Sequence, residues 1–130
     1  MMQDTQMRNK AVISVVDDDE SIRMALESLL RSSGYQARTY CDALEFLNST
    51  GPAETQCLIS DIQMPGMCGI TLRERLIAMG FNIPTIFITA FPGELPRAAP
   101  DTQGLIACLP KPFEAERLLS CVETALGQPL

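Results

Sequence analysis

The fold is decided by residues 11–21, which read AVISVVDDDES. Five of the first six residues are apolar and mostly β-branched, and this run of strand length ends abruptly at three aspartates. A strand that is apolar on both faces belongs inside a parallel sheet. From Ser21 onward the apolar residues recur at helical spacing, and Gly34 is placed to end the helix. This stretch therefore predicts one strand followed by one helix.

The same alternation of strand and helix recurs along the chain. Further strands are expected at residues 35–40, 57–60, 83–88 and 105–109, and further helices at residues 43–47, 71–80 and 114–126. The helix at 43–47 runs into Gly51 and Pro52, and Thr71 and Glu74 have the spacing of a capping box at the start of the next one. Strands that alternate with helices predict a parallel sheet with right-handed crossovers. The expected fold class is therefore α/β, with three layers arranged α/β/α.

Composition narrows the class of protein. The chain has 130 residues, of which 46% are hydrophobic and 20% charged, so it is expected to form one packed domain. It has no histidine, which excludes histidine-dependent catalytic triads, histidine-ligated zinc and a role as a histidine phosphodonor. The net charge is −6, and the only lysines are Lys10 and Lys111. Nucleic acid and anionic membranes are therefore not expected as direct partners.

The cysteines and the absence of long apolar runs indicate the compartment. The five cysteines are odd in number and form no CxxC pair, which favours reduced thiols that are mostly buried as small hydrophobic side chains. No apolar run approaches the roughly 18 residues of a membrane span. Residues 1–10 are polar, unlike a signal peptide. We therefore expect a cytoplasmic protein.

Polar side chains stand at four of the predicted strand ends. Asp17 and Asp18 follow the first strand, Asp61 the third, Thr89 the fourth and Lys111 the last. Ligands of parallel sheets bind beyond the carboxyl ends of the strands, so these groups are expected to converge. One such residue alone indicates a helix cap or a solvated side chain, but three converging carboxylates repel each other unless a cation lies among them. Oxygen ligands favour Mg²⁺, and a carboxylate beside Mg²⁺, a hydroxyl and an ammonium is suited to accept a phosphoryl group.

Four motifs have the order and spacing of a known family. They are VVDDDES at residues 15–21, LISDIQMPGMCG at residues 58–69, IFITA at residues 86–90 and LPKPF at residues 109–113. Together they resemble the receiver domain of two-component response regulators, in particular the receivers of nitrogen-fixation and nodulation regulators. The resemblance extends over residues 10–126, with residues 1–9 as a disordered tail and residues 127–130 as a C-terminal end or the start of a linker. It implies a flavodoxin-like fold with five parallel strands in the order 2-1-3-4-5.

The resemblance also implies a role for the acidic residues. Asp61 accepts the phosphoryl group, Asp18 ligates Mg²⁺ directly, and Asp17 acts mainly through water. The backbone carbonyl of Gln63 is a third protein ligand of the ion. A sensor histidine kinase supplies the phosphoryl group in a reaction that the receiver itself promotes, so the chain is expected to be a signalling domain and not an enzyme. Phosphorylation then switches the conformation that controls an output partner, such as a DNA-binding domain in a longer parent chain.

The last two strand ends complete the implied site. Thr89 hydrogen-bonds the phosphoryl group, and Lys111 pairs with it. Ala90 matches the small residue that leaves the site open. The resemblance further implies a cis peptide bond before Pro112.

Two features depart from the family pattern. Prolines recur at four-residue intervals within residues 92–100, where the family has its fourth helix. A proline inside a helix costs about 3 kcal/mol, so we expect this helix to be irregular or missing. Cys108 stands where the family usually has Tyr or Phe and is interpreted as a buried strand residue. Two alternatives stay open: a receiver-like binding module that signals without phosphate, and a small aspartyl-phosphate hydrolase for which Asp17 and Asp19 supply a DxD pattern.

Overall fold

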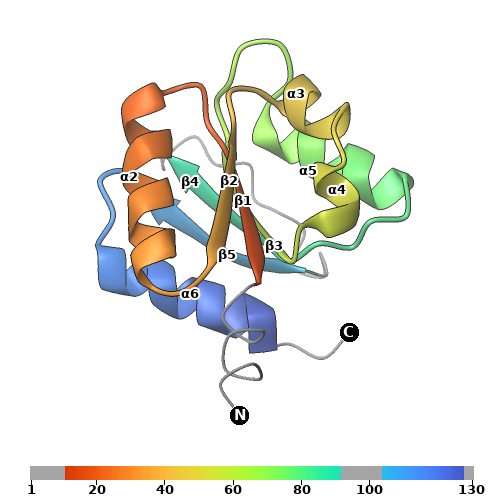
Figure 1. The fold of residues 1–130 in the computed structure, drawn as a ribbon. Helices are drawn as coiled ribbons and strands as arrows, with labels where there is room; N and C mark the ends of the chain where they lie inside the picture. The colour runs from red at the N-terminus through yellow and green to blue at the C-terminus, as the bar shows by residue number, and fades with distance from the viewer. Residues whose placement is uncertain (1–10, 92–103, 128–130) are drawn as a thin grey trace.

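The computed structural model of the chain describes residues 11–91 and 104–127, and one parallel sheet lies between two layers of helices (Figure 1). The strands are β1 (Val12–Val16), β2 (Gln36–Tyr40), β3 (Cys57–Asp61), β4 (Thr85–Thr89) and β5 (Leu105–Pro110). Their order in the sheet is β2-β1-β3-β4-β5, and every neighbouring pair is parallel. The predicted flavodoxin-like α/β fold is confirmed.

Helices connect the strands and cover both faces of the sheet. They are α2 (Glu20–Ser32), α3 (Ala43–Leu47), α4 (Gly51–Glu54), α5 (Gly69–Ala78) and α6 (Ala115–Gly127). Helices α2 and α6 lie on one face, and α3, α4 and α5 lie on the other (Figure 1). The carboxyl ends of all five strands therefore meet at one edge of a sheet that is covered on both sides.

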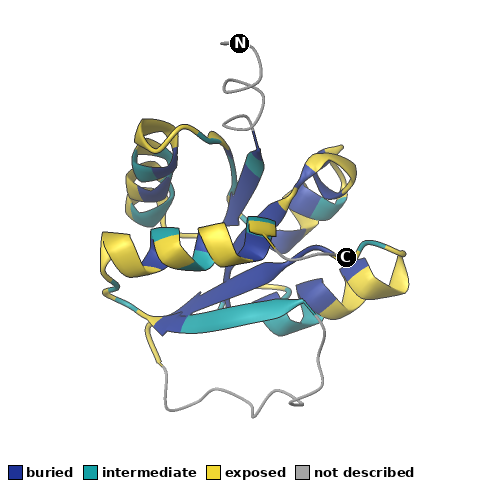
Figure 2. Cartoon of the chain, turned by 90° about the horizontal axis from the view of Figure 1, so that it is seen from below, coloured by how far each residue is buried: buried dark blue, intermediate teal, exposed yellow. Residues whose placement is uncertain are grey.

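Each face of the sheet has its own hydrophobic core. Ile13 and Ile59 belong to the core beneath α2 and α6, whereas Val16 and Leu58 belong to the core beneath α3 and α5. All residues of β3 and β4 are buried, and β5 at the edge of the sheet is only partly buried (Figure 2). Burial on both faces is why the central strands are continuous apolar runs.

Helix α2 begins and ends where local chemistry favours it. The Asp19 carboxylate accepts a hydrogen bond from the Ser21 backbone N–H at 2.8 Å, which caps the helix. Gly34 follows the helix with a φ of 95°, in the left-handed region that favours glycine. The strand and helix predicted from residues 11–34 are both present.

The boundaries of two other elements differ from the prediction. Gly51 and Pro52 begin the short helix α4 instead of ending α3. Proline is tolerated in a first helical turn, where its missing N–H would have no partner within the helix. Strand β4 begins at Thr85, two residues later than expected. Pro84, which has no N–H to donate to a neighbouring strand, lies just before it.

The start of α5 depends on a tertiary contact. The helix begins at Gly69 without a side-chain cap, so the capping box predicted from Thr71 and Glu74 is wrong. The Gly69 N–H donates to the carbonyl of Ile62 at 2.9 Å, and a Cβ on Gly69 would overlap the backbone carbonyl of Asp61. Glycine lets the helix start directly against the end of β3.

Some expectations concern residues outside the described ranges. They are the disordered tail at residues 1–9, the irregular fourth helix within residues 92–100 and the character of residues 128–130, and they stay predictions. Among the helices of residues 11–91 and 104–127, none is long and apolar enough to cross a membrane.

Candidate functional site

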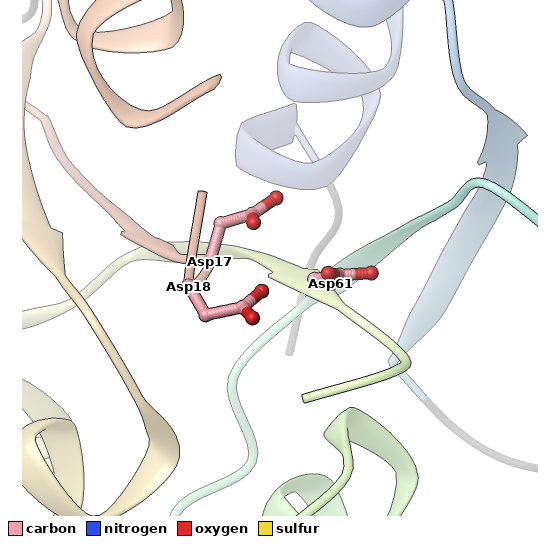
Figure 3. A group of neighbouring side chains, drawn as sticks. All are labelled: Asp17, Asp18 and Asp61. Atoms are coloured by element: carbon pink, nitrogen blue, oxygen red, sulfur yellow. The ribbon is translucent and has the colours of Figure 1, made fainter. Parts of the chain in front are cut away.

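Three carboxylates from two adjacent strand ends meet at the carboxyl edge of the sheet. Asp17 and Asp18 follow β1, and Asp61 is the last residue of β3, which pairs with β1. One carboxylate oxygen of each residue lies within 4.8 Å of the other two. The Asp17 and Asp18 side chains extend toward Asp61 (Figure 3). Asp17 and Asp61 are buried and Asp18 is exposed, so the cluster is open to solvent on one side.

Lys111 brings a positive charge into the cluster from the edge strand β5. It follows β5, and its Nζ lies 2.9 Å from Asp17 Oδ2 and 3.4 Å from Asp61 Oδ2. The backbone N–H of Lys111 donates to the Thr89 carbonyl at 2.7 Å, which aligns it with the end of β4. The peptide bond between Lys111 and Pro112 is cis, as the family resemblance implies. Within residues 11–91 and 104–127, three carboxylates thus share one ammonium, so this cluster carries more negative than positive charge.

The pKa shifts show how the excess charge is distributed. Burial raises the pKa of Asp61, and the neighbouring Asp17 carboxylate raises it further, against the opposing effects of Lys111 and the Gln63 backbone N–H. Burial alone would lower the pKa of Lys111, but its bonds with Asp17 and Asp61 raise the pKa overall. The lysine is therefore held in its charged form, while the raised pKa of Asp61 indicates that Lys111 does not fully compensate the charge of that carboxylate.

The donor atoms fit a small divalent cation. The cluster offers only carboxylate oxygens, which are the ligands that Mg²⁺ prefers. Asp18 is exposed at the open side, whereas Asp17 is buried behind it. An ion bound between Asp18 and Asp61 would supply the positive charge that Lys111 alone does not.

The backbone around Asp17 is held firmly. The Asp17 N–H donates to the Tyr40 carbonyl at 3.1 Å, and its Oδ1 accepts from the Asp19 N–H at 2.9 Å. Arg23 Nη1 donates to the Asp17 carbonyl at 2.7 Å. The sequence analysis did not identify Arg23, although an arginine in the first turns of a helix is a usable signal, because the helix dipole disfavours a cation there. These hydrogen bonds hold Asp17 in place within the site.

The Thr89 hydroxyl takes part in two hydrogen bonds, one of which involves a side chain that the sequence analysis missed. Its hydroxyl donates to Gln63 Oε1 at 2.8 Å and accepts from the Phe91 N–H at 3.0 Å. The sequence analysis assigned only the backbone carbonyl of Gln63, and that assignment as an ion ligand stays a prediction. The signal for the side chain is weak, because only the pairing of β3 with β4 brings residues 63 and 89 together.

The remaining residues named in the sequence analysis differ in burial. Ala90 is exposed beside Thr89, and its role of leaving the site open stays a prediction. Cys108 lies on β5 opposite Phe87 of β4, so it is a strand residue as predicted, although it is only partly buried. The five cysteines are all unpaired, and Cys57 is the one that is fully buried; Cys41 is exposed. The expectation that most of them are buried is therefore wrong.

The family model described as the response regulator receiver domain matches residues 13–123. This chain belongs to that family. The receiver domain is 40% identical over 118 residues to Response regulator protein TmoT of Ectopseudomonas mendocina, covering 90% of this chain and 53% of that protein. It is 37% identical over 122 residues to Nodulation protein W of Bradyrhizobium diazoefficiens, covering 93% and 53%. The chain therefore spans about half the length of the curated relatives it matches, and the resemblance to nodulation regulators is confirmed.

Solved structures agree with this assignment. The receiver domain superposes on response regulator StyR with a TM-score of 0.83 and 44% identity, over 90% of this chain and 59% of that one. It superposes on response regulator TrrA of Thermotoga maritima, crystallised with Mg²⁺ and BeF, with a TM-score of 0.77 and 26% identity over 89% and 99%.

Proposed function

We propose that this receiver domain accepts a phosphoryl group on Asp61 in a reaction that depends on Mg²⁺. The observation that carries the proposal is the convergence of three carboxylates, from β1 and β3, around the single ammonium of Lys111. Without a ligand, such a cluster lowers the stability of the folded chain, because burial and mutual repulsion disfavour the charged carboxylates. It is well suited to a ligand that brings a divalent cation and phosphoryl oxygens.

Among the three carboxylates, Asp61 is the best candidate for the nucleophile. Both oxygens of Asp17 are engaged, Oδ1 by the Asp19 N–H and Oδ2 by Lys111, each at 2.9 Å. Asp18 is exposed and suited to hold an ion. Asp61 ends β3 beside β4, whose last residue is Thr89, and is 3.4 Å from Lys111. An oxygen of Asp61 attacks phosphorus, the bond to the donor's leaving group breaks, and an acyl phosphate forms.

Mg²⁺ would be held by Asp18 and Asp61 directly, by Asp17 through water and by the Gln63 carbonyl. When bound, the ion supplies positive charge to the carboxylates and to the phosphoryl oxygens. Lys111 neutralises phosphoryl charge from the side opposite the ion, and the Thr89 hydroxyl donates a hydrogen bond to a phosphoryl oxygen. The phosphoryl group adds about −1.5 to −2 charges to this edge of the sheet, which is the signal that the domain transmits.

The partners and location belong to the same proposal. The phosphoryl donor is a sensor histidine kinase, and the receiver promotes only its own phosphorylation and dephosphorylation. Because this chain matches only about half the length of these relatives, the output is a further domain or partner, such as a DNA-binding domain. Five unpaired cysteines fit the reducing conditions of a cytoplasm.

Phosphorylation by acetyl phosphate tests this function directly. Intact-protein mass spectrometry should find one added phosphoryl group on the wild type with Mg²⁺, and none when a chelator removes the ion. Asp61→Asn should abolish the adduct. Asp19→Asn is the matched control, because it removes a neighbouring charge outside the cluster and asparagine still caps α2.

Other outcomes favour the alternatives. A wild type without a Mg²⁺-dependent adduct, indistinguishable from Asp61→Asn, would support a binding module that signals without phosphate. Sustained turnover of a generic phosphomonoester would support a hydrolase.

A further inference from the structure

The Thr89 hydroxyl has its hydrogen committed before any phosphoryl group arrives. A hydroxyl has one hydrogen to donate and lone pairs to accept. Here the Phe91 N–H occupies a lone pair at 3.0 Å, and the hydrogen is directed to Gln63 Oε1 at 2.8 Å. The hydrogen that the proposed function assigns to a phosphoryl oxygen is therefore used by Gln63.

The surrounding backbone keeps these two side chains facing each other. Thr89 is fully buried, and its carbonyl accepts the Lys111 N–H at 2.7 Å. The Ile62 N–H, next to Gln63, donates to the Ile88 carbonyl at 3.1 Å, which joins the loop after β3 to β4. Backbone hydrogen bonds thus join the end of β4 both to the loop after β3 and to Lys111 after β5. The side-chain contact between Gln63 and Thr89 can break while these backbone bonds stay.

We propose that the Gln63 side chain is a positioning residue that holds the Thr89 hydroxyl in the unphosphorylated domain and thereby sets how easily the domain switches. We call the hydrogen bond between these two side chains the Gln63–Thr89 latch. The inference rests on the proposed function, because it takes Thr89 as a contact of the phosphoryl group. When Asp61 is phosphorylated, the Thr89 hydrogen leaves Gln63 Oε1 and is donated to a phosphoryl oxygen.

Opening the latch also affects the chain that follows β4. As the Thr89 oxygen turns toward the phosphoryl group, the Phe91 N–H loses its acceptor. The Phe91 side chain is exposed, so the backbone at this residue is free to move when that bond breaks. The latch therefore opposes the switch by the net worth of one hydrogen bond, which corresponds to an affinity change of about 2- to 12-fold.

Beryllofluoride, a mimic of the phosphoryl group, measures this opposition. Calorimetric titration at saturating Mg²⁺ compares the wild type with Gln63→Met, which keeps the side-chain length and removes the acceptor oxygen. Gln63→Met should bind beryllofluoride about 2- to 12-fold more tightly. Gln36→Met is the matched control, because Gln36 is exposed at the opposite end of the sheet, and it should bind as the wild type does.

A double-mutant cycle separates a latch from a merely structural contact. Gln63→Met and Thr89→Val, combined, should show coupling in urea denaturation of the unliganded domain and no coupling with Mg²⁺ and beryllofluoride bound. Hydrogen exchange of the Phe91 amide should be faster in unliganded Gln63→Met than in the wild type.

The outcomes distinguish this inference from the function on which it rests. Unchanged or weaker beryllofluoride binding by Gln63→Met, or equal coupling in both states, would overturn the latch and leave Asp61 as the acceptor. A wild type that binds no beryllofluoride with Mg²⁺ would overturn the proposed function and the latch together.

Discussion

The two ends of the parallel sheet both bury polar groups, but a pair of hydroxyls toward the amino-terminal end differs in charge from the carboxylate cluster at the carboxyl end. Toward the amino-terminal end, Ser14 Oγ lies 2.6 Å from Thr55 Oγ1, and the Thr55 hydroxyl donates to the Gly51 carbonyl at 2.6 Å. These groups are neutral, and each donor has an acceptor. At the carboxyl end, Asp17 and Asp61 share the one ammonium of Lys111. The hydroxyl pair has its hydrogen-bond partners within the folded chain, whereas the proposed function assigns further partners of the carboxylates to a ligand.

The presence of a surface cavity does not explain why we expect an ion at the carboxyl end. The amino-terminal end has a cavity of about 250 Å³ lined by neutral residues: Thr55, Gln56, Asn82, Ile83, Pro84, Ala125 and Leu126. None of the residues that line this cavity is a carboxylate. An ion is drawn to unbalanced charge, so the carboxyl end is the one that we expect to respond to Mg²⁺.

The largest expected effect is stabilisation of the charged end by Mg²⁺. At a Mg²⁺ concentration 100 times its dissociation constant, the free energy of unfolding should rise by about 2.7 kcal/mol. Urea denaturation in MgCl₂, compared with NaCl of equal ionic strength, measures the gain without general screening. Asp18→Asn should lose most of the gain and Asp19→Asn should keep it. Equal gains in the wild type and Asp18→Asn would contradict the comparison.

The next effect concerns the hydroxyl pair of Ser14 and Thr55. Thr55→Val should lower the free energy of unfolding by about 1–3 kcal/mol, because the buried Ser14 hydroxyl loses its partner. Thr124→Val, on the exposed face of α6, should change it by no more than about 0.5 kcal/mol. Chemical denaturation measures both. The gain from Mg²⁺ should be the same in Thr55→Val as in the wild type, and a reduced gain would show that the two ends are not independent.

The smallest effect is the relief of charge repulsion in the metal-free domain. Asp61→Asn should raise the free energy of unfolding at neutral pH by about 1 kcal/mol or less, because it removes a buried charge and its repulsion with Asp17 but also the ion pair with Lys111. Because the pKa of Asp61 is raised in the folded state, its contribution favours folding below the unfolded value of about 3.9. That contribution is lost as pH rises through the higher folded pKa.

A pH series of denaturation curves checks the sign. The metal-free wild type should lose stability relative to Asp61→Asn as pH increases from about 3.9 through the folded pKa of Asp61. A difference that stays constant over this interval, or that grows in favour of the wild type, would show that Lys111 already balances the cluster.

Local patterns are sufficient to predict most of the elements. The apolar run at 11–16 and the helical spacing after Ser21 correspond to β1 and α2, with Asp19 and Gly34 at the helix ends. The start of α5 could not be predicted in this way. Thr71 and Glu74 have the spacing of a capping box, yet Gly69 begins the helix because the backbone of Asp61 lies against it. A close approach between distant segments leaves no trace in local spacing.

The same distinction applies to the site. The sequence shows that carboxylates, a hydroxyl and a lysine follow the predicted strands. Their convergence could be predicted as well, because the carboxyl ends of parallel strands meet at one edge of the sheet. The bonds of Gln63 to Thr89 and of Arg23 to the Asp17 carbonyl could not be predicted, because they depend on side-chain rotamers and on contacts across strands.

The order of apolar and polar residues by itself determined the alternating α/β fold and the residue types at the edge of the sheet. Only the tertiary structure decided that Asp17 forms an ion pair with Lys111 and that Asp18 is exposed. It also decided that the Thr89 hydroxyl donates its hydrogen to Gln63. The physical reason is range: hydrophobic periodicity is a property of neighbouring residues, whereas Coulomb interactions and hydrogen bonds depend on distances of a few ångströms between segments that only the folded chain brings together.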